Sequence, residues 1–276
     1  MELLPYTFKW IEVLLRWSHV LFAILWIGNS FLFNYLDNKL EKNTTSKGVD
    51  ADGILQHSGW FYRVERLNAA PEKLSKNLII FKWQSYLTFI TGMLLLIIIY
   101  YANSKILMID KRVNENITPL MGIGISIFSI IGSWLIYDLI CKSKLINKKI
   151  IFIVVLLIIG AVISFFLTKI FGSRFAFLSV GVILGCIMFF NVFFVIIPNG
   201  KNITLNTEKF DLNLSISAKT RSVHNNIITF LVLFVMLSGH YSFIWISQYN
   251  WIILSFLSII LGLIRHYFNL RAKKKI

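Results

Sequence analysis

Seven long apolar runs constrain the fold of this chain more than any other feature of its sequence. A helix needs about 20 mostly apolar residues to cross the hydrocarbon core of a bilayer. With 57% hydrophobic and 15% charged residues, the chain does not suit a water-soluble fold. The sequence therefore predicts an all-α, polytopic membrane helix bundle of about seven transmembrane helices, forming one membrane domain over residues 1–276. The runs cover residues 10–35, 79–102, 118–141, 149–169, 174–198, 223–246 and 249–270.

The placement of Lys and Arg predicts how the bundle is oriented. With seven spans, the loops at 36–78, 142–148 and 199–222 share a side with the C-terminus and carry most basic residues. Basic residues concentrate on the cytoplasmic side, so we expect an outer N-terminus and a cytoplasmic C-terminus. The charge of +15 is spread over four segments instead of one aromatic-interleaved patch, so no nucleic-acid partner is expected. The other side carries Lys9, Lys105, Lys111, Arg112, Lys169 and Arg174.

The cysteines, glycines and missing motifs exclude several kinds of chemistry. Cys141 and Cys186 are far apart and lie in or at the edge of different expected helices. They suggest neither a disulfide framework nor a thiolate metal site. The sequence has no CxxCH for attaching a c-type haem, no nucleotide-binding glycine motif and no nucleophile elbow. Gly181 and Gly185 form a small-xxx-small face that we expect to pack against another helix.

The first apolar run contains a polar stripe with a titratable ring. Arg16, His19, Ala23, Trp26 and Ser30 are spaced three or four residues apart, so they share a helix face that should point into the bundle. Ionisable residues inside a membrane usually face a cavity, a cofactor or a partner. His19 is therefore the first residue for which we expect a ligand.

His240, near the outer end of the expected sixth helix, is the candidate partner of His19. The two rings are expected at comparable depth in the outer half of the membrane. Two imidazoles from different helices at one level suit axial ligation of a b-type haem. Alternatively, each ring simply hydrogen-bonds a backbone carbonyl or an aromatic neighbour, and the sequence leaves both explanations open.

A second polar group gathers at the cytoplasmic ends of the last two expected helices. The string RSVHNN opens the sixth helix and RH closes the seventh. Free backbone N–H groups at a helix start favour an anion, and Asn side chains offer donors and acceptors to a heterocycle. A flat, acidic, nitrogen-rich ring would suit such a site, whereas the alternative is headgroup contact by Arg and helix capping by Asn. The residues are Arg221, His224, Asn225, Asn226, Arg265 and His266.

The expected cytoplasmic loop at 36–78 has a polar first part and an aromatic second part, ILQHSGWFYRVERLNAAPEKL. The aromatic residues Trp60, Phe61 and Tyr62 would bury at the bilayer interface or the bundle, while Arg63 stays solvated or reaches a ligand. One interpretation is an interfacial amphipathic segment. The other is a lid or binding element containing His57, because loops longer than about 15 residues often have such roles.

A series of motifs runs in order through nearly the whole chain: RWSHVLFAILWIGNSFLFNYLD, GWFYRVERL followed by AAP, FKWQSYLTFITG, GSWLIYDLICKS, RFAFLSVGVILGCIMFFNVFFVIIPNGK, RSVHNN with MLSGHY, and RHYFNLR. In order and spacing these motifs resemble the membrane domain of the membrane-bound urate hydroxylases, the urate oxidase N-terminal family. The first helix, with its His and the following WIG, is also similar to a wider set of membrane proteins in which such a His is associated with haem.

This resemblance implies a multi-pass protein of a bacterial-type cytoplasmic membrane that oxidises urate to 5-hydroxyisourate. The added oxygen would come from water, and the electrons would leave through a cytochrome c toward the respiratory chain, without hydrogen peroxide as product. Family members typically continue into an eighth helix and a C-terminal cytochrome c domain, whereas this sequence reaches RAKKKI after the seventh run. We therefore expect a separate cytochrome c or other respiratory-chain acceptor, or a shortened relative with altered activity.

The expected topology, with the clustering and depth of these residues, suggests a substrate site at the cytoplasmic end and a haem b ligated by His19 and His240. His224 is the candidate base for urate or for the attacking water. Arg221 or Arg63 would pair with the urate anion and stabilise charge on its carbonyls. The ring would be oriented by Asn225 and Asn226, and the other expected substrate contacts are His57, Arg265 and His266.

Two non-catalytic functions compete with this expectation. One is a haem-bearing electron conduit serving another oxidase, which explains the histidine pair equally well. The other is a purine transporter, but the chain shows no convincing internal repeat and none of its four prolines lies mid-span, as transporters often require. Asp138 and Asn191, in or near expected helices, are either structural hydrogen-bonding residues or part of a proton path.

Overall fold

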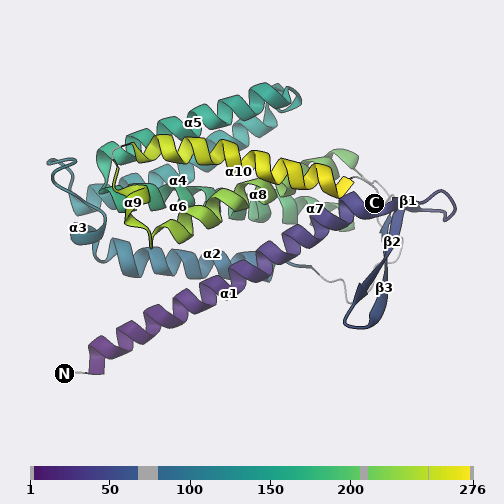
Figure 1. Ribbon diagram of the computed structural model, residues 1–276, viewed down its shortest axis with the longest axis horizontal. Helices are drawn as coiled ribbons and strands as arrows, with labels where there is room; N and C mark the ends of the chain where they lie inside the picture. Colours follow the sequence, from purple (N-terminus) through teal and green to yellow (C-terminus); the bar gives the residue numbers. More distant parts are fainter. Residues whose placement is uncertain (1–2, 68–79, 206–210, 248, 274–276) are drawn as a thin grey trace.

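The computed structural model describes residues 3–67, 80–205, 211–247 and 249–273 as a bundle of long helices with a small sheet at one end (Figure 1). Within these residues, seven helical segments are long and apolar enough to cross a membrane. They confirm the expected all-α polytopic bundle. The segments are Tyr6–Lys39, Trp83–Tyr101, Pro119–Lys142, Lys149–Ile170, Ser173–Ile203, Leu212–Ser238 and Asn250–Phe268.

Most helices lie close to the expected apolar runs. A π-helical turn, Leu96–Tyr101, extends the second span, and another, Val192–Ile196, lies within the fifth. A 3-10 turn, Lys144–Asn147, joins the third span to the fourth. The α-helices are α1 (Leu3–Lys39), α2 (Trp83–Leu95), α3 (Ser104–Leu107), α4 (Pro119–Lys142), α5 (Lys149–Ile170), α6 (Ser173–Asn191), α7 (Ile197–Leu205), α8 (Leu212–Ser238), α9 (Ser242–Trp245) and α10 (Asn250–Lys273).

The sixth span is the exception, because the run expected at 223–246 is displaced in the structure. α8 begins at Leu212, and the Asp211 side chain caps it by accepting a hydrogen bond from the Asn213 N–H (2.8 Å). Residues 212–222 contain neither Pro nor Gly, so the helix continues through a polar stretch that hydropathy excludes. At the other end α8 stops at Ser238, and a turn follows in which the Tyr241 N–H donates to the Ser238 carbonyl (2.9 Å).

The loop expected at 36–78 begins with an antiparallel three-stranded sheet, which the sequence analysis did not predict. The strands are β1 (Glu41–Lys42), β2 (Val49–His57) and β3 (Trp60–Leu67), in the order β1-β2-β3. β2 and β3 are joined by Ser58 and Gly59, both with positive φ (51° and 82°), which is typical of the tightest hairpins. Residues 68–79, including the AAP motif, lie outside the described part of the chain.

Helix α6 lies among α4, α5 and α8 in the interior of the bundle (Figure 1). A Cβ atom placed on Gly181 would lie 2.7 Å from Cγ1 of Val235, so this glycine permits the close approach of α6 and α8. The expected packing face is therefore confirmed at Gly181. A Cβ atom on Gly185 would have no neighbour within 4 Å.

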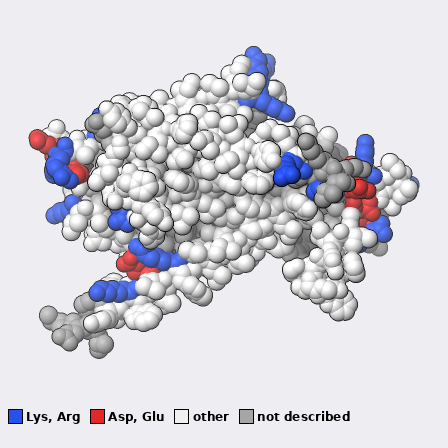
Figure 2. All heavy atoms as spheres, in the orientation of Figure 1, with Lys and Arg blue, Asp and Glu red and all other residues white. Residues whose placement is uncertain are grey.

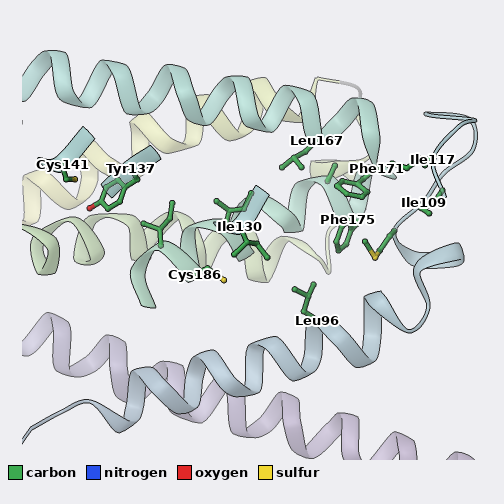
Figure 3. Packing of buried hydrophobic residues seen from close by; sticks show 14 of the residues in the cluster. Leu96, Ile109, Ile117, Ile130, Tyr137, Cys141, Leu167, Phe171, Phe175 and Cys186 are labelled. Atoms are coloured by element: carbon green, nitrogen blue, oxygen red, sulfur yellow. The ribbon is translucent and has the colours of Figure 1, made fainter. Parts of the chain in front are cut away.

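The main hydrophobic core runs along α4, α5 and α6 (Figure 3). At one end the rings of Phe171 and Phe175 pack edge to face, with centroids 4.9 Å apart. At the other end lie Tyr137 and Cys141. Cys141 and Cys186 are buried free thiols. Tyr137 brings a hydroxyl to the end of this core, where the polar site begins.

Candidate functional site

A buried polar network joins α4, α6 and α8 near the end of the bundle that carries the sheet. Arg221 is 3% exposed, and its guanidinium donates to Oδ1 of Asn191 (3.1 Å) and Oδ1 of Asp138 (2.5 Å). The same guanidinium lies 4.9 Å from the centroid of the Tyr137 ring. Lys142 adds a second cation, 2.6 Å from Oδ2 of Asp138. The buried cation is thus paired with a carboxylate, as a charge removed from water requires.

The orientation of the Asn191 amide follows from the arginine. A guanidinium can only donate, so the oxygen of Asn191 faces Arg221 and its amide nitrogen donates elsewhere. That nitrogen donates to the Tyr137 hydroxyl oxygen (3.3 Å) and to Oδ1 of Asn225 (2.9 Å). The Tyr137 hydroxyl lies 2.8 Å from Nδ1 of His224, and the donor of this hydrogen bond depends on the His224 tautomer. We assign the Tyr137 hydrogen to Nδ1, an arrangement in which a neutral His224 carries its own hydrogen on Nε2.

In this assignment His224 acts as a donor, and the base role expected for it stays a prediction. Nδ1 then accepts from Tyr137, and Nε2 carries an N–H that is able to donate to an oxygen. The ring is half-buried and stacks against Phe152 of α5, with centroids 5.2 Å apart. The arrangement therefore suits stabilisation of negative charge better than removal of a proton.

The neighbouring amides Asn225 and Asn226 are engaged by other helices. Asn225 donates to the Met188 carbonyl (2.9 Å) of α6. Asn226 donates to the Ser30 hydroxyl (3.0 Å) of α1 and accepts from Nε of Arg265 (2.5 Å) in α10. Both side chains thus hold helices together in this structure, instead of offering the free amide edges expected for a heterocycle.

The anion site expected at a helix start is wrong for a related reason. α8 begins at Leu212, so Arg221 and the three site residues after it lie inside the helix, where backbone N–H groups bond within it. At the end of the seventh span, α10 continues to Lys273. There Arg265 faces the bundle, with its guanidinium 5.0 Å from the Phe31 ring centroid, whereas His266 is exposed.

The sheet residues His57 and Arg63 make their described contacts within the sheet. Arg63 forms ion pairs with Asp52 (3.3 Å) and Glu65 (2.9 Å). His57 is exposed next to the hairpin turn, opposite Trp60 in the strand register. The structure therefore does not join these two residues to the Arg221 network, and their expected substrate role stays a prediction.

His19 is held against α2 in a single tautomer. Its Nδ1 lies 3.0 Å from the Thr88 carbonyl and 3.1 Å from the Thr91 hydroxyl. Because a carbonyl only accepts, Nδ1 carries the hydrogen and Nε2 keeps its lone pair. A Cβ on Gly92 would lie 2.9 Å from Cε1 of the ring, so glycine makes room for it. Arg16, one turn earlier in the expected stripe, pairs instead with Glu12 (2.7 Å).

His240 occupies a different setting from the one expected. It lies after the end of α8, in the turn that leads to α9, and its side chain is exposed. The expectation that it sits inside the sixth span is therefore wrong, because the helix ends at Ser238. Haem ligation by the pair stays a prediction.

Tyr137 is the site residue that sequence reasoning missed. Asp138 and Asn191 were recognised as polar residues of the spans, but their hydrogen-bond partners were not predicted. Their signal was present: each is a polar group in an otherwise apolar span. What the sequence did not show was that the three side chains, on α4 and α6, converge on one arginine of α8.

The fold and the network together define a class: a polytopic helical membrane protein with a buried Arg–Asp pair bonded to an Asn–Tyr–His chain. The family model described as urate oxidase N-terminal matches residues 5–276. The chain therefore belongs to the urate oxidase N-terminal family. Neither the search of curated proteins nor the search of solved structures gave a match.

Proposed function

We propose that this protein oxidises urate to 5-hydroxyisourate at the Arg221–His224 network, with water as the oxygen source and a cytochrome c as the acceptor. The reaction adds the oxygen of one water and releases two protons and two electrons, so two cytochromes c are reduced per urate. Membership of the family supports urate as the compound. The observation that supports the location is the paired, buried guanidinium of Arg221, linked through Asn191 and Tyr137 to the His224 ring.

In this site Arg221 and His224 would stabilise the negative charge of the urate anion. Arg221, fixed by Asp138 and Asn191, supplies positive potential without having to reorganise. The His224 Nε2–H would donate to an oxygen of the urate anion and gain strength as charge develops on that oxygen. Tyr137 keeps this donor in place by occupying Nδ1.

The electrons need a carrier, and His19 fits the role of a haem b ligand. Its Nδ1–H is bonded to a backbone carbonyl and its Nε2 lone pair is left for a metal, the arrangement found in histidine ligands generally. A bound haem would accept electrons one at a time.

Turnover by the intact chain in a bacterial-type lipid membrane tests the proposal. Urate loss is followed with ferricytochrome c for the wild type, for Arg221→Lys, which keeps the charge but loses the two-pronged geometry, and for Lys144→Gln. Lys144 is an exposed lysine with no described role in the network. We expect at least a tenfold loss in Arg221→Lys and near-normal turnover in Lys144→Gln. Equal rates in both folded variants would place the chemistry elsewhere.

The electron-conduit function is the second candidate, because the His19 geometry supports a haem ligand without requiring any urate site. A sample whose b-type spectrum disappears in His19→Ala, but whose wild-type form neither consumes urate nor is reduced by it, would support the conduit. Reduction of that spectrum by urate would support the oxidase.

A further inference from the structure

The hairpin formed by β2 and β3 ends in an uncharged, aromatic tip. Residues 53–62 contain no Asp, Glu, Lys or Arg. Four large apolar side chains of this stretch are at least half exposed: Ile54 (73%), Trp60 (71%), Phe61 (72%) and Tyr62 (50%). Contiguous exposed apolar groups usually mark a surface that meets a partner or a membrane.

The apolar side chains lie on both faces of the hairpin. Side chains alternate along a strand, so Trp60 and Tyr62 share one face while Phe61 lies on the other. Ile54 pairs with Arg63, and Phe61 with Gln56, which puts Ile54 on the Phe61 face. A protein surface docked on one face would leave the other uncovered. A lipid headgroup region, which surrounds whatever enters it, covers both.

The base of the sheet, in contrast, is charged and attached to the helices. Arg66 pairs with Asp50 (2.6 Å) and with Asp37 at the end of α1 (3.4 Å). Asp37 also forms an ion pair with Lys219 of α8. In the space-filling view the charged groups of this end gather at the base, while the hairpin tip shows none (Figure 2). The sheet is thus held at one end and exposes its apolar tip at the other.

The hairpin also extends in the direction that a membrane anchor needs. It runs transversely to the helix axes at the end of the bundle and projects sideways beyond α2 (Figure 1). Since the helices cross the bilayer, a transverse hairpin at their ends lies near the plane of the headgroups. Trp and Tyr are the residues enriched at that depth.

We propose that the tip of this hairpin, defined by Ile54, Trp60, Phe61 and Tyr62, is an interfacial anchor that inserts into the lipid headgroup region beside the bundle. The anchor is independent of the proposed reaction. It holds the sheet against the membrane while the ion pairs of Asp37 tie the base of the sheet to α1 and α8.

Site-directed labelling of the full chain tests the anchor. Single cysteines are introduced as Trp60→Cys and Phe61→Cys, on opposite faces of the tip, and as Lys47→Cys, an exposed position in the β1–β2 connection. Each is labelled with an environment-sensitive dye in vesicles of phosphatidylcholine and phosphatidylglycerol. Cys141 and Cys186 are buried, so wild-type protein serves as the blank. Quenching by nitroxide lipids is compared with quenching by aqueous iodide.

We expect both tip labels to be quenched by nitroxide lipids at least threefold more than the label at 47, and the label at 47 to be quenched mainly by iodide. Iodide quenching of all three labels alike would show that the tip lies in water and overturn the anchor. Protection of the tip from both quenchers, or lipid quenching on only one face, would show a protein partner or a second copy and would overturn it equally. Gel filtration and circular dichroism confirm that each labelled variant is folded.

Discussion

Arg221 is a buried cation that depends on partners from two other helices, and this dependence makes a strong prediction about stability. In Asp138→Asn the guanidinium loses its carboxylate, and removing one partner of a buried pair costs about 3–5 kcal/mol. Lys142→Gln removes the other cation of Asp138, but its side chain is 68% exposed, so a cost below about 1 kcal/mol is expected. Thermal unfolding in detergent compares the two. Similar losses in both variants would contradict the buried pair.

Tyr137 is predicted to act through His224. In Tyr137→Phe the hydrogen bond to Nδ1 is lost. His224 is then no longer held in the tautomer that carries its hydrogen on Nε2, and the Nε2–H becomes a weaker donor. One hydrogen bond is worth about 1 kcal/mol, so a drop of roughly fivefold in urate turnover is expected. Nitrogen NMR of labelled histidine, assigned with His224→Asn, should show Nε2 protonated in the wild type and a tautomer mixture in the variant. An unchanged tautomer would contradict the assigned hydrogen-bond directions.

Asp110, in the connection between α3 and α4, supplies a prediction about pH. Hydrogen bonds from Arg112 hold the pKa of this carboxyl below its ordinary value of 3.8. The folded form therefore gains stability from the ionised carboxylate above pH 3.8, and loses it as the pH falls through the lowered pKa. In Arg112→Gln the pKa should rise toward 3.8, so the loss of stability at low pH becomes smaller and is complete at a higher pH. A carbon NMR titration of labelled Asp measures the Asp110 pKa in the wild type and in the variant. Identical titration curves would contradict the pairing of Asp110 with Arg112.

At the scale of helices and strands, the sequence was informative where apolar patterning decides the structure. Six spans lie near their expected positions because their apolar runs are uninterrupted. The sixth was misplaced since Asp211 starts α8 within a polar stretch. The sheet was not predicted because the polar and aromatic residues from Gln56 to Glu65 do not alternate strictly and suit an interfacial segment as well as a hairpin. The Ser58–Gly59 pair is a signal for a hairpin turn, and it was not interpreted as one.

The close packing of α6 against α8 can be tested with paired glycine substitutions. Gly181→Ala places a methyl group 2.7 Å from Val235, and overpacking of this kind costs about 1–3 kcal/mol. Gly185→Ala has open space around the new Cβ and should be neutral or stabilising by up to about 1 kcal/mol, because Ala favours the helix. The change in thermal stability relative to the wild type should differ between the two variants in sign or clearly in size. Equal effects would contradict the close approach at Gly181.

At the scale of the whole molecule, the site could be predicted only in part. Arg221, His224 and their Asn neighbours were recognised from the sequence as a polar group in a membrane protein. Their partners were not, because pairing between α4, α6 and α8 depends on how the helices pack. His57 and Arg63 were assigned to the same site through their shared membrane side, yet the fold places them in the sheet. Two residues on the same side of the membrane need not belong to one site, whereas residues that contact each other do lie together.

The proposed function requires that urate gives its electrons to a cytochrome c without oxygen. The most direct measurement is anaerobic incubation of the intact chain in lipid nanodiscs with urate and ferricytochrome c, recording both compounds in one cuvette. We expect that urate disappears with two cytochromes c reduced for each urate, and that admitting air produces no hydrogen peroxide. Urate consumption that requires oxygen and yields peroxide, or no consumption by a haem-loaded sample, would contradict it.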